Sequence, residues 1–192
     1  MEKITCFKAY DVRGRIPDQI NEEVVYRIGR AYAAFLSPRT VVVGEDIRLS
    51  SVELREALVR GLTESGVDVK LLGLCGTECV YFATDHYDYD GGIMVTASHN
   101  PMDYNGLKFV REGSRPISGD TGLEEIRALA EKNEFPQAPM GGVEEIDWKG
   151  DYIDALLGYV ERDKLKPLKV VVNAGNGGAG EIVDLLEPHL PF

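Results

Sequence analysis

Residues 91–110 read GGIMVTASHNPMDYNGLKFV, and their pattern limits the kind of sheet that this chain can form. Two apolar runs, residues 92–97 and 107–110, predict buried strands. The polar stretch between them, SHNPMDYNG, is too short for a helical crossover. We therefore expect these two strands to be antiparallel neighbours in a mixed sheet.

Strands and helices alternate along the chain on the N-terminal side of this stretch. The first residues, 4–10, have an extended pattern, and short apolar runs at 40–44 (TVVVG) and 67–72 predict further buried strands. Amphipathic helices are expected after an N-cap at Asn21, after a capping box of Ser50 with Glu53, and over residues 77–86 and 122–132. This alternation predicts an α/β fold with a layered, mixed but largely parallel sheet flanked by helices.

The chain divides into a first domain, a linker and the start of a second domain. We expect an α/β domain over residues 1–134 and a linker over residues 135–150, which opens with the irregular stretch FPQAPMGG. A helix at 151–162, a strand at 168–173 (LKVVVN) and a helix from 182 follow. One strand with one helix cannot bury its own apolar faces. Residues 151–192 are therefore expected to be the truncated start of a second α/β domain, and the chain to be a fragment.

Composition excludes several classes of protein. The 192 residues are 44% hydrophobic and 28% charged, as in ordinary globular proteins, and no apolar run approaches the length of a membrane helix. The formal charge of −11 argues against a nucleic-acid partner. Without an N-terminal apolar stretch, a cytoplasmic location and no membrane partner are expected. Cys6, Cys75 and Cys79 are expected to be reduced thiols packed as small hydrophobic groups.

The most informative candidate site is the loop that begins at Ser98. A buried strand delivers this serine to its C-terminal end, where open α/β sheets place their ligands. Ser98 is a candidate nucleophile or phosphoryl carrier, and His99, Asn100 and Lys108 are candidate donors or charges for an anion. Spacing alone favours an ordinary turn. A serine-hydrolase triad fits poorly, because adjacent residues of an extended segment point to opposite sides and no G-x-S-x-G elbow is present.

Two motifs resemble one family of enzymes. TASHNP (96–101) followed by YNGLK (104–108) resembles the phosphoserine loop of the α-D-phosphohexomutases, and FKAYDVRG (7–14) resembles their N-terminal substrate-side motif. FKAYDVRG is closer to the bacterial phosphomannomutase/phosphoglucomutase branch than to the phosphoglucosamine mutases, and KFVREGSRPISGDTGL (108–123) resembles the phosphomannomutases in particular. The resemblance implies interconversion of hexose 6-phosphates and hexose 1-phosphates, of mannose or glucose, through a phosphoserine and a hexose 1,6-bisphosphate.

The resemblance also implies roles for individual residues. Ser98 would carry the phosphoryl group, and one oxygen of its phosphate would bind Mg²⁺. His99 and Lys108 would lie beside that phosphate as catalytic groups. Arg13 would serve both catalysis and substrate binding, with Tyr10 and Asn100 as further substrate-binding residues. Hexose phosphates and the bisphosphate are the partners expected.

The chain departs from the family pattern, which leaves alternatives open. The family's Asp-Gly-Asp-x-Asp metal loop is missing, and Asp88-Tyr89-Asp90 is its nearest counterpart, in the wrong context. A complete mutase cycle is therefore not expected from this chain. A phosphosugar-binding module without turnover is one alternative. Another is a dinucleotide-binding oxidoreductase, because GNGGAG (175–180) satisfies G-x-G-x-x-G between an expected strand and an expected helix.

Overall fold

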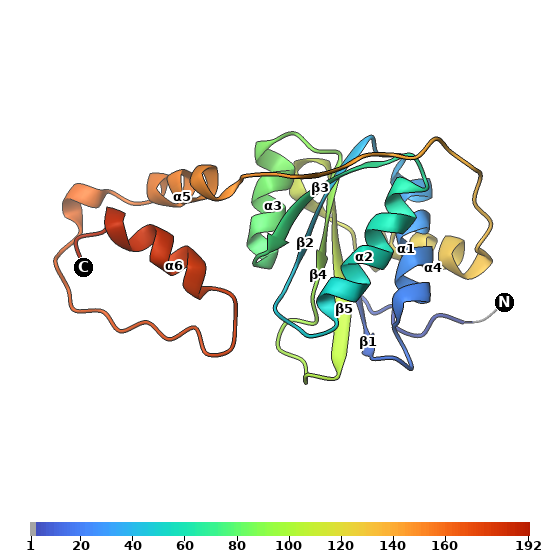
Figure 1. Cartoon of the computed structure of the whole chain (residues 1–192), viewed down its shortest axis with the longest axis horizontal. Helices are drawn as coiled ribbons and strands as arrows, with labels where there is room; N and C mark the ends of the chain where they lie inside the picture. The colour runs from blue at the N-terminus through green and yellow to red at the C-terminus, as the bar shows by residue number, and fades with distance from the viewer. Residues whose placement is uncertain (1–2) are drawn as a thin grey trace. The chain divides into compact units, whose positions relative to one another are not determined.

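The computed structural model of the chain describes residues 3–192 (Figure 1). These residues form two compact units, of which the first ends at Ile146 and the second begins at Asp147.

A single mixed sheet lies at the centre of the first unit. Its strands, within residues 3–146, are β1 (Val12–Arg15), β2 (Thr40–Glu45), β3 (Asp68–Leu74), β4 (Gly91–Val95), β5 (Tyr104–Arg111), β6 (Arg115–Pro116) and β7 (Val143–Glu145). Their order is β1-β5-β4-β2-β3-β7, with β6 paired to β5. Strands β4, β2, β3 and β7 are parallel, whereas β5 is antiparallel to β4, β1 and β6. The mixed, largely parallel sheet and the antiparallel β4–β5 pair predicted from the sequence are confirmed.

Helices cover both faces of this sheet, as Figure 1 shows. Three of them, α1 (Glu22–Leu36), α2 (Ser51–Thr63) and α4 (Leu123–Lys132), pack on one face, and α3 (Thr77–His86) lies on the other. The main core forms between the first three helices and alternate strand residues such as Val41, Val43 and Ile93. All four helices were predicted from the sequence.

The starts of α1 and α2 differ in how they are capped. The side chain of Asn21 accepts a hydrogen bond from the Val24 amide, as an N-cap should. The capping box predicted for Ser50 and Glu53 is wrong, because Ser50 makes no side-chain cap bond. Its Oγ instead accepts a hydrogen bond from Asn105 Nδ2 at 2.9 Å. A tertiary contact with β5 thus replaces the local one.

Two segments of the first unit depart from the sequence analysis. Residues 4–10 form turns and a single bridge between Phe7 and Val12 rather than an extended strand. Residues 135–142 lack regular structure, as predicted, but β7 follows within the segment assigned to the linker. Its residues, Val143–Glu145, are all exposed. Their sequence, VEE, lacks the alternation of apolar and polar residues by which a strand is recognised.

The second unit contains helices without a sheet. Its α-helices are α5 (Lys149–Gly158) and α6 (Gly180–Leu186), the latter close to the helix predicted from residue 182, and two short 3-10 helices lie at Arg162–Lys164 and Glu187–His189. Helix α5 ends earlier than the predicted residue 162. The strand predicted at 168–173 is wrong: these residues form no strand, and Val171 is 89% exposed. A strand needs a partner for its backbone groups, and residues 147–192 supply none.

Candidate active site

The candidate site lies beyond the carboxyl end of β4, where the chain turns back toward β5. Thr96 and Ala97 are buried, and Ser98 is the first exposed residue of the loop. Ser98 has a φ of 55°, in the left-handed region. This conformation costs a non-glycine residue about 1–2 kcal/mol, so the contacts around the loop must compensate for it. The backbone thus presents the Ser98 side chain to solvent.

The left-handed turn also changes the relation of Ser98 to His99. The two residues were expected to point apart, as in an extended segment, and this expectation is wrong. Ser98 Oγ lies 3.4 Å from Nδ1 of His99, and both side chains are exposed. At that distance the hydrogen bond is weak, so His99 borders the serine hydroxyl without holding it firmly.

Two cations predicted for the site converge on one carboxylate. Arg13 Nη2 donates to Asp11 Oδ2 at 2.7 Å, and Lys108 Nζ donates to the same oxygen at 3.2 Å. The register of β1 with β5 pairs Arg13 with Gly106 and Val12 with Leu107, which places Lys108 next to Asp11. Asp11 is 8% exposed, and the side chains of Arg13 and Lys108 are 20% and 26% exposed. A buried acid therefore fixes both cations while leaving part of each accessible.

Arg13 connects this cluster to the serine loop. Its Nη1 donates to Asn100 Oδ1 at 2.7 Å, so a residue from the first motif contacts a residue from the second. Arg13, Asp11, Lys108 and Asn100 thus form one hydrogen-bonded group, two residues from Ser98. Tyr10 precedes Asp11 in the chain but does not join this group of described residues. It is 80% exposed.

Like Asp11, three further residues near the site were not singled out from the sequence. Arg48, in the loop after β2, donates to four carbonyl oxygens of the serine loop, and Asp46 forms an ion pair with it at 3.3 Å. The pKa of Tyr81, on α3, is raised mainly by burial and further by the negative charge of Asp11. The sequence signal for Arg48 was its position after a buried strand, in the charged loop GEDIRLS.

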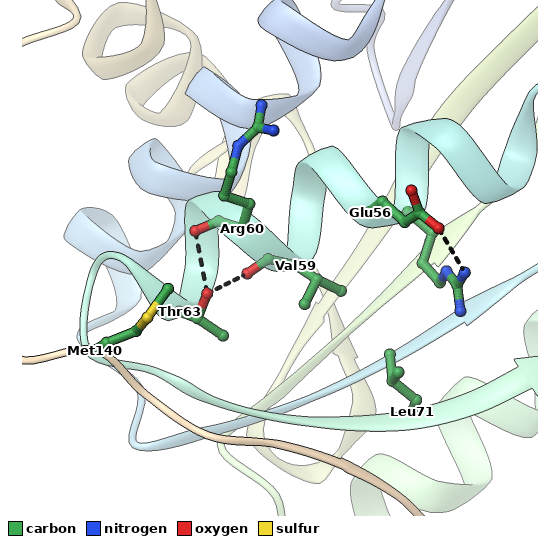
Figure 2. Close-up of a pocket in the computed structure, with 7 residues that line it drawn as sticks. Glu56, Val59, Arg60, Thr63, Leu71 and Met140 are labelled. Carbon is green, nitrogen blue, oxygen red and sulfur yellow. Dashed lines mark hydrogen bonds and ion pairs between the residues drawn. The ribbon is translucent and has the colours of Figure 1, made fainter.

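A depression elsewhere on the first unit does not coincide with this site. It has a volume of about 300 Å³ and lies between α2, β3 and Met140, as Figure 2 shows. Two of its polar side chains have partners: Thr63 Oγ1 donates to the Val59 carbonyl at 2.9 Å, and Arg55 Nη2 lies 3.5 Å from Glu56 Oε1. None of the predicted site residues lines it, so it does not belong to the serine loop.

Comparison with known proteins identifies the domain. Residues 5–137 match the family description "Phosphoglucomutase/phosphomannomutase, alpha/beta/alpha domain I". The chain belongs to this family. The matched segment contains the serine loop, the Arg13 cluster and the sheet up to the irregular stretch after α4.

Relatives and solved structures extend this likeness to nearly the whole chain. A phosphomannomutase of Salmonella typhimurium is 56% identical over 193 residues, covering 99% of this chain and 42% of its own length. A protein of Xanthomonas campestris named "Phosphohexose mutases" is 58% identical and is also covered to 42%. A phosphoglucomutase/phosphomannomutase family protein from Burkholderia thailandensis has a similar structure, with a TM-score of 0.88, 35% identity, and coverage of 99% of this chain and 43% of its own. The chain thus spans less than half the length of these proteins.

The phosphohexomutase domain carries no preformed metal centre in the described residues. Within residues 3–192, no group of three or more His, Cys, Asp or Glu side chains could hold a metal ion. The side chain of Asp90, in the Asp88-Tyr89-Asp90 stretch, accepts hydrogen bonds from the backbone amides of Arg39 and Thr40 instead. The residues present therefore do not fit a complete Mg²⁺ site.

The glycine-rich turn at 175–180 does not have the context of a dinucleotide fingerprint. The turn leads into α6, as expected, but the residues before it form no strand and are exposed. A Rossmann turn requires a buried strand that ends at its first glycine. Together with the family membership, this leaves no observation that favours the oxidoreductase alternative.

Proposed function

We propose that this chain contributes the phosphoserine domain of a phosphohexomutase, which interconverts the 6-phosphate and 1-phosphate of mannose or glucose. One observation carries the proposal. Ser98 is exposed at the carboxyl end of a buried parallel strand, in a loop hydrogen-bonded to a cluster that holds Arg13 and Lys108. The names of the relatives support the reaction class, and the short coverage of their length makes the whole cycle part of the proposal.

The proposed reaction begins when the Ser98 hydroxyl attacks one phosphorus atom of a hexose 1,6-bisphosphate. A bond forms between Oγ and phosphorus, the bond from phosphorus to the sugar oxygen breaks, and the hydroxyl proton passes to the departing sugar oxygen. The phosphoserine then transfers this group to the free hydroxyl of a hexose monophosphate that is phosphorylated at the other position. The bond from phosphorus to Oγ breaks, the proton of the sugar hydroxyl passes to Oγ, and a bisphosphate is regenerated, so the serine carries the phosphoryl group between the two positions. Such transfers depend mainly on positioning and on stabilisation of charge.

The residues around Ser98 suit those two tasks. Arg13 and Lys108 can donate hydrogen bonds to phosphoryl oxygens, and their attachment to Asp11 orients them before substrate arrives. His99 borders the hydroxyl and supplies a further donor or acceptor. Asn100 and Tyr10 are proposed to contact the sugar phosphate. Asn100 is hydrogen-bonded to Arg13 and so lies beside the proposed phosphate-binding group, and the ring of Tyr10 is exposed to solvent.

We also propose that Mg²⁺ is the cofactor, bound by an oxygen of the Ser98 phosphate. A phosphoserine is close to a dianion at neutral pH and offers the hard oxygen ligands that this ion prefers. The remaining ligands would have to come from outside the described residues or from water, since residues 3–192 hold no three-ligand group.

Hexose phosphates and the bisphosphate are the proposed partners, and the cytoplasm is the proposed location. The net charge of −11 argues against binding to nucleic acid. Among residues 3–192, no helix is both long enough and apolar enough to cross a bilayer.

Phosphoryl uptake by the chain tests the proposal. The chain is incubated with mannose or glucose 1,6-bisphosphate and Mg²⁺, and its intact mass is measured over time. We expect one phosphoryl group to be added, and Ser98→Ala to abolish this addition. Ser37→Ala is the matched control, because Ser37 is also exposed and has a φ of 51°. A folded wild-type chain that gains no phosphoryl group would favour the binding module without turnover.

A further inference from the structure

Both peptide groups that flank Ser98 are held by side chains. The Ser98 amide donates to Thr96 Oγ1 at 2.8 Å, and the Ser98 carbonyl accepts from Arg48 Nη2 at 2.9 Å. The Ser98 side chain itself is exposed. The backbone of this residue is therefore fixed on both sides in its left-handed conformation, while the hydroxyl stays free to react.

Arg48 also holds the rest of the loop. Its Nη2 donates to the Asn100 carbonyl at 2.6 Å, and its Nη1 donates to the carbonyls of Pro101 and Tyr104 at 2.7 and 2.9 Å. The Arg48 side chain is only 12% exposed. One guanidinium thus bonds four carbonyls spread over residues 98–104, which is a task for a planar group with several donors.

Asp46 joins the two contacts on Ser98 into one network. Its Oδ2 accepts from Thr96 Oγ1 at 2.6 Å and lies 3.3 Å from Arg48 Nε. Its Oδ1 accepts from the Arg48 amide at 3.1 Å and from Ser51 Oγ at 2.6 Å. Asp46 follows β2 and Ser51 begins α2, so the network ties the loop to rigid elements of the fold.

We propose that Arg48 and Asp46 are positioning residues for phosphoryl transfer at Ser98, because together they hold the strained serine so that its hydroxyl faces the incoming phosphorus. This inference rests on the proposed function. Neither residue touches the reacting atoms, since both act through the loop backbone and Thr96. Their loss is expected to lower the rate of transfer more than the affinity for the bisphosphate.

The first test replaces Arg48 with lysine, which keeps the charge but cannot bond four carbonyls. The rate of Ser98 phosphorylation is measured against the concentration of glucose 1,6-bisphosphate. We expect the maximal rate to fall about 10- to 100-fold, while the half-saturating concentration changes little. Arg55→Lys is the matched control: the Arg55 side chain is 18% exposed and ion-paired to Glu45, outside the loop, and this variant should keep the wild-type rate.

A second pair of variants tests the other side of Ser98 without touching a charge. Thr96→Val keeps the shape of the side chain but removes the oxygen that bonds the Ser98 amide and Asp46. Thr96→Ser retains that oxygen. We expect valine to slow phosphorylation as lysine does at position 48, and serine to restore most of the rate. This pair also serves if Arg48→Lys fails to fold.

Amide exchange of the loop separates failure of this inference from failure of the proposed function. Arg48→Lys is expected to speed exchange at Asn100 and Tyr104, whose amides bond within the loop, and to leave β2 unchanged. If the wild-type chain takes up no phosphoryl group, the proposed function fails. Unchanged exchange of the loop amides in Arg48→Lys would then overturn the positioning role of Arg48 as well. If the wild-type chain is phosphorylated and Arg48→Lys and Thr96→Val react equally fast, only the inference is overturned.

Discussion

Asp11 organises the candidate site, although its sequence context gives little sign of this. It lies in FKAYDVRG between Tyr10 and Arg13, residues that the resemblance indicated directly. Its partner Lys108 is 97 residues away, and only the register of β1 with β5 brings the two together. The candidate residues Ser98, His99, Lys108 and Arg13 were predictable from motifs. Asp11, which binds both cations, was not predictable, because the register between two strands cannot be inferred from the sequence of either strand alone.

Replacement of Arg13 tests this arrangement. Arg13→Ala removes a cation beside the loop, the donor to Asn100 Oδ1, and one of the two partners of buried Asp11. We expect phosphoryl uptake to slow by at least about tenfold, since loss of one charged donor at a transfer site has effects of this size or larger. Intact-mass time courses measure it. Arg15→Ala is the control, because Arg15 is 51% exposed and pairs with Asp18. Equal rates for Arg13→Ala and wild type would contradict the role of Arg13.

The elements were predictable where burial alone determines them. Strands β2 and β4 are continuous apolar runs and α1 has a clear apolar face, so their positions follow from the sequence. Strand β7 could not be predicted, because an exposed edge strand is recognised only by the neighbour that it pairs with. The apolar run at 168–173 is the converse case. It has strand-like residues, but no partner strand is present among residues 147–192.

The contact of α3 with the sheet depends on a residue without a side chain. Gly92, in β4, faces α3, and a Cβ atom there would lie 2.3 Å from Thr84 Oγ1 and 2.9 Å from Val80 Cγ1. Thr84 is buried and its hydroxyl donates to the Val80 carbonyl, so it has little freedom to move. We expect Gly92→Ala to lower the free energy of unfolding by about 1–3 kcal/mol.

Urea unfolding, followed by circular dichroism, measures this effect. Gly150→Ala is the control, because nothing lies within 4 Å of a Cβ at Gly150. That variant should leave stability unchanged or raise it slightly, since alanine favours a helix. Equal midpoints for Gly92→Ala and wild type would show that α3 can move away from the sheet without cost.

The first unit of the chain has an extensive hydrophobic core, whereas the second unit has only a small one. The first unit buries its apolar residues between the sheet and its helices, whereas Leu168, Val170, Val171 and Val172 in the second unit are all more than half exposed. The sequence analysis expected the second unit to lack a full core, because the one strand and one helix predicted there could not bury their own apolar faces. The specific conformation of residues 166–179 was beyond prediction for the same reason.

Amide exchange across the whole chain tests this division. The amides of residues 170–172 are expected to exchange almost as fast as those of an unfolded peptide, because no strand or helix pairs them. The amides of β2, which lies between β3 and β4, should be strongly protected and serve as the control in the same sample. Protection of 170–172 comparable to that of β2 would contradict this prediction.

Strand β7 has a consequence for the connection between the two units. It is parallel to β3, and the amide of Ile146 donates to the Leu71 carbonyl at 3.1 Å. Because α5 begins at Lys149, the tether between the last residue bonded to the sheet and that helix consists only of Asp147 and Trp148, although the irregular segment before β7 is far longer. Substitutions that detach β7 would therefore lengthen the tether several-fold without adding a residue, and would lower the effective concentration of one unit near the other.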